Sequence, residues 1–249
     1  MEKTIQDLLQ LAKSIHKKHS ANFSFLSLSA LSSNETFFIS DSSVSFETID
    51  EKGFCEIGLE PIQRLLKSDY LSEKEILEIL DNAKIKKSST VISSKAVTNA
   101  VAHQLTGIKY VAQIQSKITN RLLCSKLGSK PYLGHIYENS VIHCGKAVAV
   151  IPFVESSYFL AKTLSQELKN YNKQYFLSPK VLLMENHGHL IFGDSVQSVI
   201  DSINTLEEWS ELLSSIFAFS SPKYLSHEQI INIENSVRDK RSFLKIRGQ

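Results

Sequence analysis

The segment from Lys180 to Phe217 constrains the fold more strongly than any other part of the chain. Apolar runs over 180–184 and 190–192 flank the turn Asn186-His187-Gly188. Short apolar runs separated by turn-forming residues predict two strands joined by a tight turn. Beyond Ser195, apolar side chains recur at helical spacing at Val196, Val199, Ile200, Ile203, Leu206 and Trp209. This pattern predicts a strand pair followed by a long helix, Ser195 to Phe217.

The rest of the chain continues the alternation of strands and helices. Strands are expected within 23–46, near 54–57, over Lys109 to Ile114 and over Lys146 to Val154. Helices are expected over 4–18, 71–82, 94–106, 119–127, 156–170 and after Ser226. Ser72 is a candidate N-cap, and Gly107 is a candidate C-cap. The alternation predicts one layered α/β domain over residues 1–249, with a solvated, flexible basic tail from about residue 238.

Composition excludes several classes of protein. The chain has 249 residues, of which 42% are hydrophobic, so it can bury a core without disulfides or a structural metal. Its 28 basic and 26 acidic residues do not predict a nucleic-acid-binding surface. Cys55, Cys124 and Cys144 match no disulfide framework or metal motif, and we expect buried free thiols. Without a signal peptide or a stretch apolar enough to span a bilayer, we expect a cytoplasmic protein that does not enter the membrane.

Four segments, in order, resemble the class II aldolase and adducin head family. They are Asn34 to Ser43, Lys109 to Ser116, Ala149 to Val154 with Leu160-Ala161-Lys162, and Val181 to Asp194. Together, the resemblance covers roughly residues 5–217. It implies a three-layer α/β/α sandwich with a central, mostly antiparallel sheet. It also implies a homo-oligomer, commonly a tetramer, with active sites between subunits. Residues 128–146 fit an insertion before the Ala149 strand.

The resemblance implies a metal site that this sequence alters. Active members hold a divalent ion, usually zinc, with two His residues from a His-x-His strand and one from Asn-His-Gly. The ion polarises a carbonyl group when a carbon–carbon bond breaks. Here the His pair is replaced by Gln113 and Gln115, and only His187 remains. Glutamine oxygens are poor zinc ligands beside imidazole, so we expect no metal cofactor unless the site has been rebuilt.

The family's other functional motifs are altered as well. Its catalytic Glu lies in Pro-Ser-x-Glu, which we align with Lys87-Ser88-Ser89-Thr90, so that Thr90 replaces the general base. Its glycine-asparagine phosphate loop falls near residues 26–29, and its Ser-Gly falls on Ser42-Ser43. The candidate substrate-binding residues are Ser27, Ser29, Ser42, Ser43, Ser88, Gln113 and Gln115.

Other histidines could rebuild a metal site. A set of His187, His189 and His143 is conceivable, with zinc or another divalent ion as cofactor. The alternative interpretation makes His189 a strand residue with a satisfied ring, His143 a loop residue, and His187 a support for its turn. Trp209 is expected in the core or at an oligomer contact.

Three hypotheses follow for function. The first is a degenerate aldolase-fold protein that acts as a binding or assembly module. The second is an active aldolase or lyase on a sugar phosphate or related hydroxy-carbonyl compound, with a rebuilt metal site. The third is a metal-independent sugar or nucleotide-sugar enzyme.

Overall fold

A computed structural model describes residues 2–19 and 23–246. Its centre is a seven-stranded sheet in the order β3-β2-β1-β4-β7-β6-β5. Every neighbouring pair is antiparallel except β5 and β6, which are parallel. The strands are β1 (Phe23–Leu31), β2 (Thr36–Ser40), β3 (Phe54–Gly58), β4 (Tyr110–Ser116), β5 (Ala149–Ile151), β6 (Val181–Met184) and β7 (Gly188–Gly193). The expected central, mostly antiparallel sheet is confirmed.

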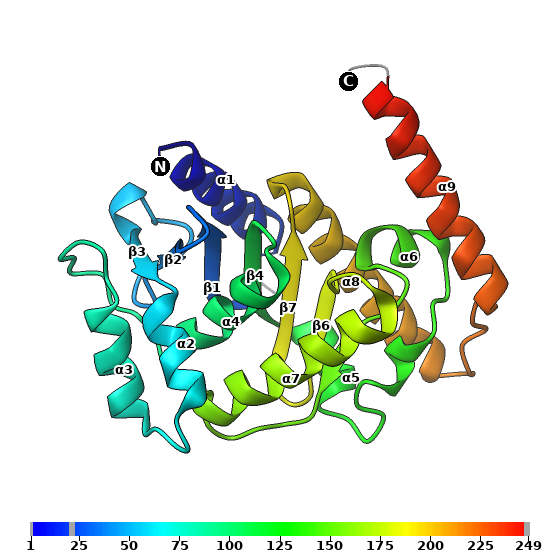
Figure 1. The fold of residues 1–249 in the computed structure, drawn as a ribbon. Coiled ribbons are helices and arrows are strands. Elements are labelled where there is room, and N and C mark those ends of the chain that lie inside the picture. The colour runs from blue at the N-terminus through cyan, green and yellow to red at the C-terminus, as the bar shows by residue number, and fades with distance from the viewer. Residues whose placement is uncertain (1, 20–22, 247–249) are drawn as a thin grey trace.

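Helices cover both faces of the sheet (Figure 1). Their bounds are α1 (Glu2–His19), α2 (Glu60–Lys67), α3 (Glu73–Asn82), α4 (Ala96–Thr106), α5 (Lys117–Leu123), α6 (Glu138–Cys144), α7 (Ser157–Tyr175), α8 (Val196–Phe217) and α9 (His227–Ile246). One core cluster joins the sheet to α1, α5 and α8, and a second joins it to α2, α3, α4 and α7. These two cores make the molecule a three-layer sandwich.

Local capping signals set several helix ends. Ser72 and Glu75 form a reciprocal capping box at α3, and Ser195 caps α8. Gly107 ends α4 with a φ of 65°, a left-handed conformation that glycine adopts without strain. These ends lie at or within one residue of the expected ones, because each depends on residues adjacent in sequence.

Several expectations differ from the structure in their bounds. The strand expected over 146–154 is limited to β5, since Pro152, which follows it, has no N–H to donate to a ladder. The helix expected over 119–127 is α5, which begins earlier because the Ser116 hydroxyl caps it. Helix α2 was not predicted; it is short and buries few side chains. Helix α9 runs to Ile246, and residues 247–249 of the expected flexible tail lie outside the described residues.

The insertion over 128–146 packs against α8. Tyr132 and His135 contact the Trp209 ring, with centroid distances of 5.3 and 4.8 Å. Trp209 is fully buried, which confirms the expectation of a core residue. Glu185 accepts hydrogen bonds from the backbone N–H and hydroxyl of Ser129 at 3.0 and 2.8 Å. The insertion is therefore tied both to the core and to the end of β6.

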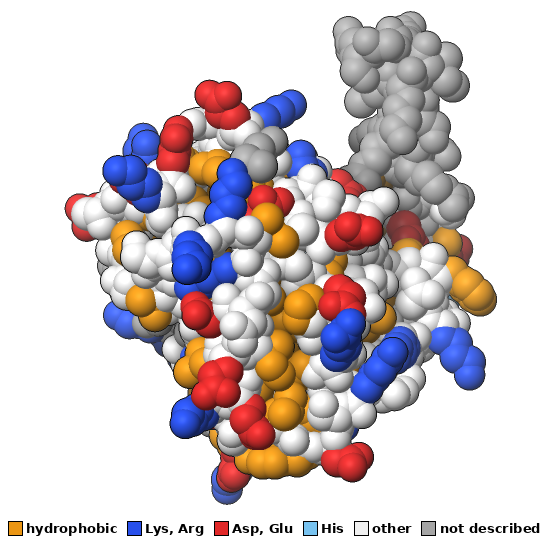
Figure 2. Space-filling view, turned by 60° about the vertical axis from the view of Figure 1, so that its left-hand side comes forward, with side chains coloured by type: hydrophobic (Ala, Val, Ile, Leu, Met, Phe, Trp, Pro, Cys, Tyr) orange, Lys and Arg blue, Asp and Glu red, His pale blue; other side chains and the backbone are white. Residues whose placement is uncertain are grey.

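The three cysteines differ in their exposure to solvent. Cys55 and Cys144 are buried free thiols, as expected, but Cys124 is exposed because it lies just past the end of α5. Within the described residues, no helix is long and apolar enough to cross a membrane. Figure 2 shows basic and acidic side chains interspersed around hydrophobic ones on the face that it displays.

Candidate functional site

The Asn186-His187-Gly188 turn brings its backbone into close contact with β4. Asn186 has a φ of 56° and Gly188 a φ of 141°. A Cβ atom at Gly188 would lie 2.4 Å from the carbonyl oxygen of Ile114, closer than any real contact. The His187 N–H closes the turn on the carbonyl of Met184 at 3.1 Å. The turn therefore requires glycine for steric reasons, and it places His187 beside the end of β4.

His187 is half-buried, and its surroundings favour the neutral form of its ring. Burial lowers its pKa, and the positive charge of Lys95 lowers it further. Its Nε2 atom is buried and has no hydrogen-bond partner within the described part of the chain. The imidazole can therefore accept or donate one more hydrogen bond, depending on its tautomer.

Gln113 and Gln115 alternate with core residues along β4, so both point toward the α4 layer. Gln113 is fully buried, and its Oε1 atom accepts a hydrogen bond of 3.0 Å from the Thr98 hydroxyl on α4. The Nε2 atom of Gln113 has no partner among described residues. Gln115 is half-buried, and its backbone lies against Gly188. Of the two amides, only that of Gln115 is near the surface.

Ser27 and Ser29 lie in strand β1, just after a shift in its register with β4 between Phe25 and Ser27, and both side chains are buried. Asn99 on α4 donates to the Ser27 hydroxyl at 2.7 Å and accepts from the Ser29 hydroxyl at 2.9 Å. Ser29 also contacts Nε2 of His103 at 2.8 Å, and burial lowers the pKa of His103 to about 4. The segment expected near a phosphate loop is thus a strand whose hydroxyls pack against α4. The substrate-binding role of Ser27 and Ser29 stays a prediction.

The structure brings the other candidate serines and Thr90 together through Asp41 and Val91. Ser42 donates to the Val91 carbonyl, and Asp41 accepts from Ser43 and from the Val91 N–H. The Thr90 side chain is buried and contacts the Ser88 hydroxyl at 2.6 Å. Burial alone would raise the pKa of Asp41, but these hydrogen bonds and the charge of Lys84 hold it below its ordinary value. These contacts join two loops, and any substrate contact here stays a prediction.

Lys95, which the sequence analysis did not single out, influences both His187 and Glu73. Lys95 immediately precedes α4 and is half-buried. Glu73 opens α3 and accepts a 3.0 Å hydrogen bond from the Ser157 N–H at the start of α7. Burial alone would raise the pKa of Glu73, but hydrogen bonds from Ser94 and Ser157 and the charge of Lys95 hold it below its ordinary value. Lys95 is therefore near enough to influence both His187 and Glu73.

The sequence contains a signal that could have placed Lys95 at the end of the family's Pro-Ser-x-Glu motif. The segment Ile92-Ser93-Ser94-Lys95 has serine in the second position of Pro-Ser-x-Glu, as does Lys87-Ser88-Ser89-Thr90. Only the former segment leads directly into a helix whose next turn contacts Gln113. No comparable local signal marks Glu73, because its position depends on how α3 packs beside α7.

The side chains present do not fit the divalent ion that the resemblance implies. Across residues 2–19 and 23–246, no group of three or more His, Cys, Asp or Glu side chains is arranged to hold a metal. His189 pairs with Ile114, whose side chain belongs to the core cluster on the α8 side, opposite Gln113. His143 lies on α6, not in a loop as expected, and lines a cavity elsewhere. The rebuilt set of His187, His189 and His143 is not brought together.

The His189 ring also differs from expectation. Its Nδ1 atom is buried without a hydrogen-bond partner among the described residues, so the ring is not fully satisfied. Burial lowers the pKa of His189 to about 3, which keeps the ring neutral.

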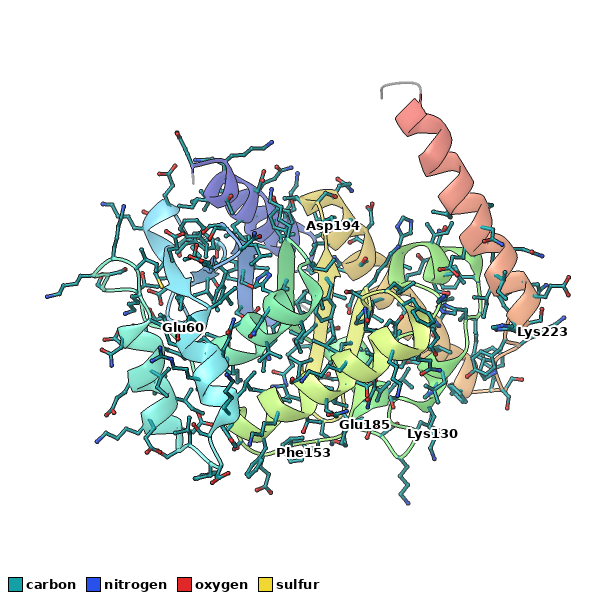
Figure 3. All side chains as sticks on the ribbon, viewed as in Figure 1. Glu60, Lys130, Phe153, Glu185, Asp194 and Lys223 are labelled. Atoms are coloured by element: carbon teal, nitrogen blue, oxygen red, sulfur yellow. The ribbon has the colours of Figure 1, made fainter. Side chains whose placement is uncertain are left out.

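A cavity of about 950 Å³ lies at the other end of β7, between α6, the start of α8 and α9. Its lining includes Gly193, Asp194, Lys146 and Glu234. In Figure 3, Asp194 and Glu185 mark opposite ends of the sheet, with Glu185 next to the Asn-His-Gly turn. The cavity is therefore separate from the site around His187.

Comparisons with known proteins agree with the fold. The family model described as Class II Aldolase and Adducin N-terminal domain matches residues 6–214. No curated protein matches the sequence. Among solved structures, the putative aldolase/epimerase/decarboxylase YgbL from Klebsiella pneumoniae is 15% identical, with a TM-score of 0.71 over 93% of this chain and 98% of that one.

Two further solved structures have a comparable sequence identity and TM-score to this chain. An L-fuculose 1-phosphate aldolase is 13% identical, with a TM-score of 0.69 over 96% of this chain and 97% of that chain. A sugar-phosphate aldolase from Thermotoga maritima is 14% identical, with a TM-score of 0.66 over 90% and 98% of the two chains. At these identities the likeness establishes the fold alone.

Proposed function

The chain belongs to the class II aldolase and adducin N-terminal domain family, and we propose that it has lost metal-dependent aldol cleavage and acts as a binding or assembly module. The observation that carries this proposal is the state of Gln113. Its Oε1 atom, the only atom of the amide suited to ligate a metal, already accepts the Thr98 hydroxyl hydrogen bond inside a sealed layer. His187 alone cannot hold a divalent ion with useful affinity, since catalytic sites use about three protein ligands.

The replacement of the general base supports the same proposal. We place Lys95, in preference to Thr90, at the position of the family's catalytic Glu, because Lys95 is near His187 while Thr90 is buried in a loop contact. Neither side chain is a carboxylate that could move a proton beside a metal-bound enediolate. The loss of the metal ligands and the loss of the general base therefore both support the loss of metal-dependent aldol cleavage.

The assembly part of the proposal is supported by exposed aromatic side chains near the same end of the sheet. Tyr70 is 60% exposed and Phe159 46% exposed, and their ring centroids are 5.8 Å apart. Phe153, which follows β5, is 53% exposed. Exposed aromatics of this kind are enriched at subunit contacts. We propose a homo-oligomer, with the tetramer implied by the family as the expected form, and light scattering of the purified protein measures it.

Elemental analysis of the full chain, purified in buffer containing zinc, manganese and iron, tests the proposal. We expect no stoichiometric metal. One metal ion per chain that disappears in His187→Ala would overturn the proposal in favour of an active aldolase with a rebuilt site. The same preparation is assayed with L-fuculose 1-phosphate, on which we expect no carbon–carbon bond cleavage.

A further inference from the structure

A second cavity, of about 460 Å³, lies between α2, α4 and α7, in the helical layer that covers one face of the sheet (Figure 1). Its two residues from α4, Gln104 and Leu105, belong to the C-terminal end of that helix. Thr98, which contacts Gln113 at the candidate site, lies near the N-terminal end. This α2–α4–α7 cavity is therefore separate from the site around His187, and it shares no lining residue with the larger cavity beside α9.

The charged side chains that line the α2–α4–α7 cavity are all lysines. Lys67 ends α2, and Lys162 and Lys169, seven residues apart, come from one face of α7. Among the described residues, no Asp or Glu lines the cavity, and none of the three lysines forms an ion pair with a carboxylate. The cavity beside α9, by contrast, is lined by both acidic and basic side chains. The α2–α4–α7 cavity therefore carries an uncompensated positive charge.

The acidic side chains nearest in sequence do not offset this charge. Glu167 on α7 accepts a hydrogen bond from the backbone N–H of Val150 on β5, so its carboxyl group is directed toward the sheet. Asp69 is exposed in the segment after α2 and does not line the cavity. An anion that enters the cavity therefore meets lysines without meeting a carboxylate.

Lys162 is half-buried and is held in a defined position. Its ammonium group donates a 2.8 Å hydrogen bond to the carbonyl of Ser68 and lies 4.7 Å from the centroid of the Tyr158 ring. The Ser68 carbonyl is at the C-terminal end of α2, where the helix dipole would otherwise repel an anion. Because an ammonium group has three N–H donors, Lys162 can bind this carbonyl and also donate to a ligand. Lys67 and Lys169 are exposed, so their side chains can adjust to a ligand.

The spacing of the lysines favours a ligand with several linked anionic groups. The Cα atoms of Lys162 and Lys169 are about 10 Å apart along α7, given a rise of 1.5 Å per residue. Lys67 approaches from a different helix. A chain of phosphate groups presents acceptor oxygens along its length and can therefore meet all three ammonium groups, whereas one phosphate is a single compact group.

The neutral part of the lining suits the same kind of ligand. Amide and hydroxyl groups can donate to phosphate oxygens, and apolar side chains can contact an attached organic group. The neutral residues of the lining are Gln63, Gln104, Gln166, Ser165, Leu66 and Leu105.

We propose that the α2–α4–α7 cavity binds an oligophosphate anion, inorganic or carried by a nucleoside, through Lys67, Lys162 and Lys169. This site goes beyond the proposed loss of aldol cleavage and does not depend on it, because it shares no residue with the site around His187.

Calorimetric titration of the chelator-treated full chain with sodium tripolyphosphate tests the inference. We expect saturable binding of one tripolyphosphate per chain, which weakens as salt is added. The double variant Lys67→Met/Lys169→Met should bind at least roughly tenfold more weakly, because it loses two charge-assisted contacts. Both side chains are exposed, so the variant should fold, and circular dichroism checks this. Lys130→Met/Lys173→Met removes two exposed charges outside the cavity and should bind like wild type.

Two further probes define the ligand. Orthophosphate should bind at least roughly tenfold more weakly than tripolyphosphate, because a single phosphate does not meet all three lysines. Adenosine triphosphate distinguishes the two sources of oligophosphate. Tighter binding than that of tripolyphosphate assigns the site to a nucleotide, with its organic part against Leu66 and Leu105. Equal or weaker saturable binding assigns the site to the inorganic anion.

Four results would overturn the inference. They are the absence of saturable tripolyphosphate binding, equal binding by wild type and Lys67→Met/Lys169→Met, equal weakening in Lys130→Met/Lys173→Met, and binding of orthophosphate as tight as that of tripolyphosphate. None of these results concerns metal bound by His187. The proposed loss of aldol cleavage is therefore judged separately, by elemental analysis.

Discussion

The Thr98 hydroxyl on α4 donates a 3.0 Å hydrogen bond to the amide oxygen of Gln113 on β4, inside a layer closed to solvent. This bond joins helix to sheet at a position that our proposed function assigns to a lost metal contact. It makes the Gln113 side chain part of the core. The stability of the fold, as well as its chemistry, should therefore depend on what occupies position 113.

Gln113→Leu should change the free energy of unfolding by less than about 1 kcal/mol, or raise it. Leucine has a similar volume and removes the buried, unpaired nitrogen, while Thr98 keeps its bond to the Lys95 carbonyl. Gln113→Ala leaves a cavity and should cost about 2 kcal/mol or more. Urea unfolding of both variants gives the comparison. Equal destabilisation by the two substitutions would contradict this prediction. It would mean that the hydrogen bonding of the amide, and not only its volume, stabilises the fold.

Gly188→Ala should destabilise the protein by about 3 kcal/mol, because both the φ of 141° and the contact with the Ile114 carbonyl oppose a side chain. Gly107→Ala is the control, since it has a positive φ of 65° but open space around it, and it should cost only about 1 kcal/mol. Thermal unfolding measures both. If the two variants melt at the same temperature, the close approach of the turn to β4 is not a steric constraint.

Stability should fall as the pH is lowered below 6.5. Burial lowers the pKa of His103 from 6.5 to about 4, so between these values the unfolded chain takes up a proton that the folded chain does not. The loss of folding free energy caused by His103 is absent above pH 6.5. Below pH 6.5 it grows by up to about 1.4 kcal/mol per pH unit. His135 and His189 add to the slope, because burial also lowers their pKa values.

His103→Gln tests this assignment. The variant loses ring contacts and should be less stable at all pH values, but its stability should decline less steeply between pH 6.5 and 4.5 than that of wild type. Urea unfolding at half-unit pH intervals gives the slope. Identical slopes would show that His103 does not change its protonation on unfolding.

Local signals predicted much of the fold. The Asn186-His187-Gly188 turn, the Ser72 and Ser195 caps and the Gly107 terminus depend on neighbours within four residues, so they could be placed from the sequence. Helix α2 was missed although its buried Ile62 and Leu65 recur at helical spacing, because an eight-residue helix shows that spacing over only about two turns.

The site was harder to predict because its residues meet through long-range packing. Strand alternation placed Gln113 and Gln115 on one face of β4, but not the contact of Gln113 with Thr98. Lys95 is brought near enough to both Glu73 and His187 to lower the pKa of each, through the packing of α3, α4 and the Asn-His-Gly turn. The spacing of these residues along the chain does not predict that they lie near one another.

Zinc titration of the chelator-treated full chain, followed by calorimetry alongside His187→Ala, tests the central claim most directly. The altered ligand set predicts that wild type and His187→Ala give the same small, non-saturating heats. Binding of one zinc ion per chain by wild type, lost in His187→Ala, would contradict the claim that this site no longer works through a metal.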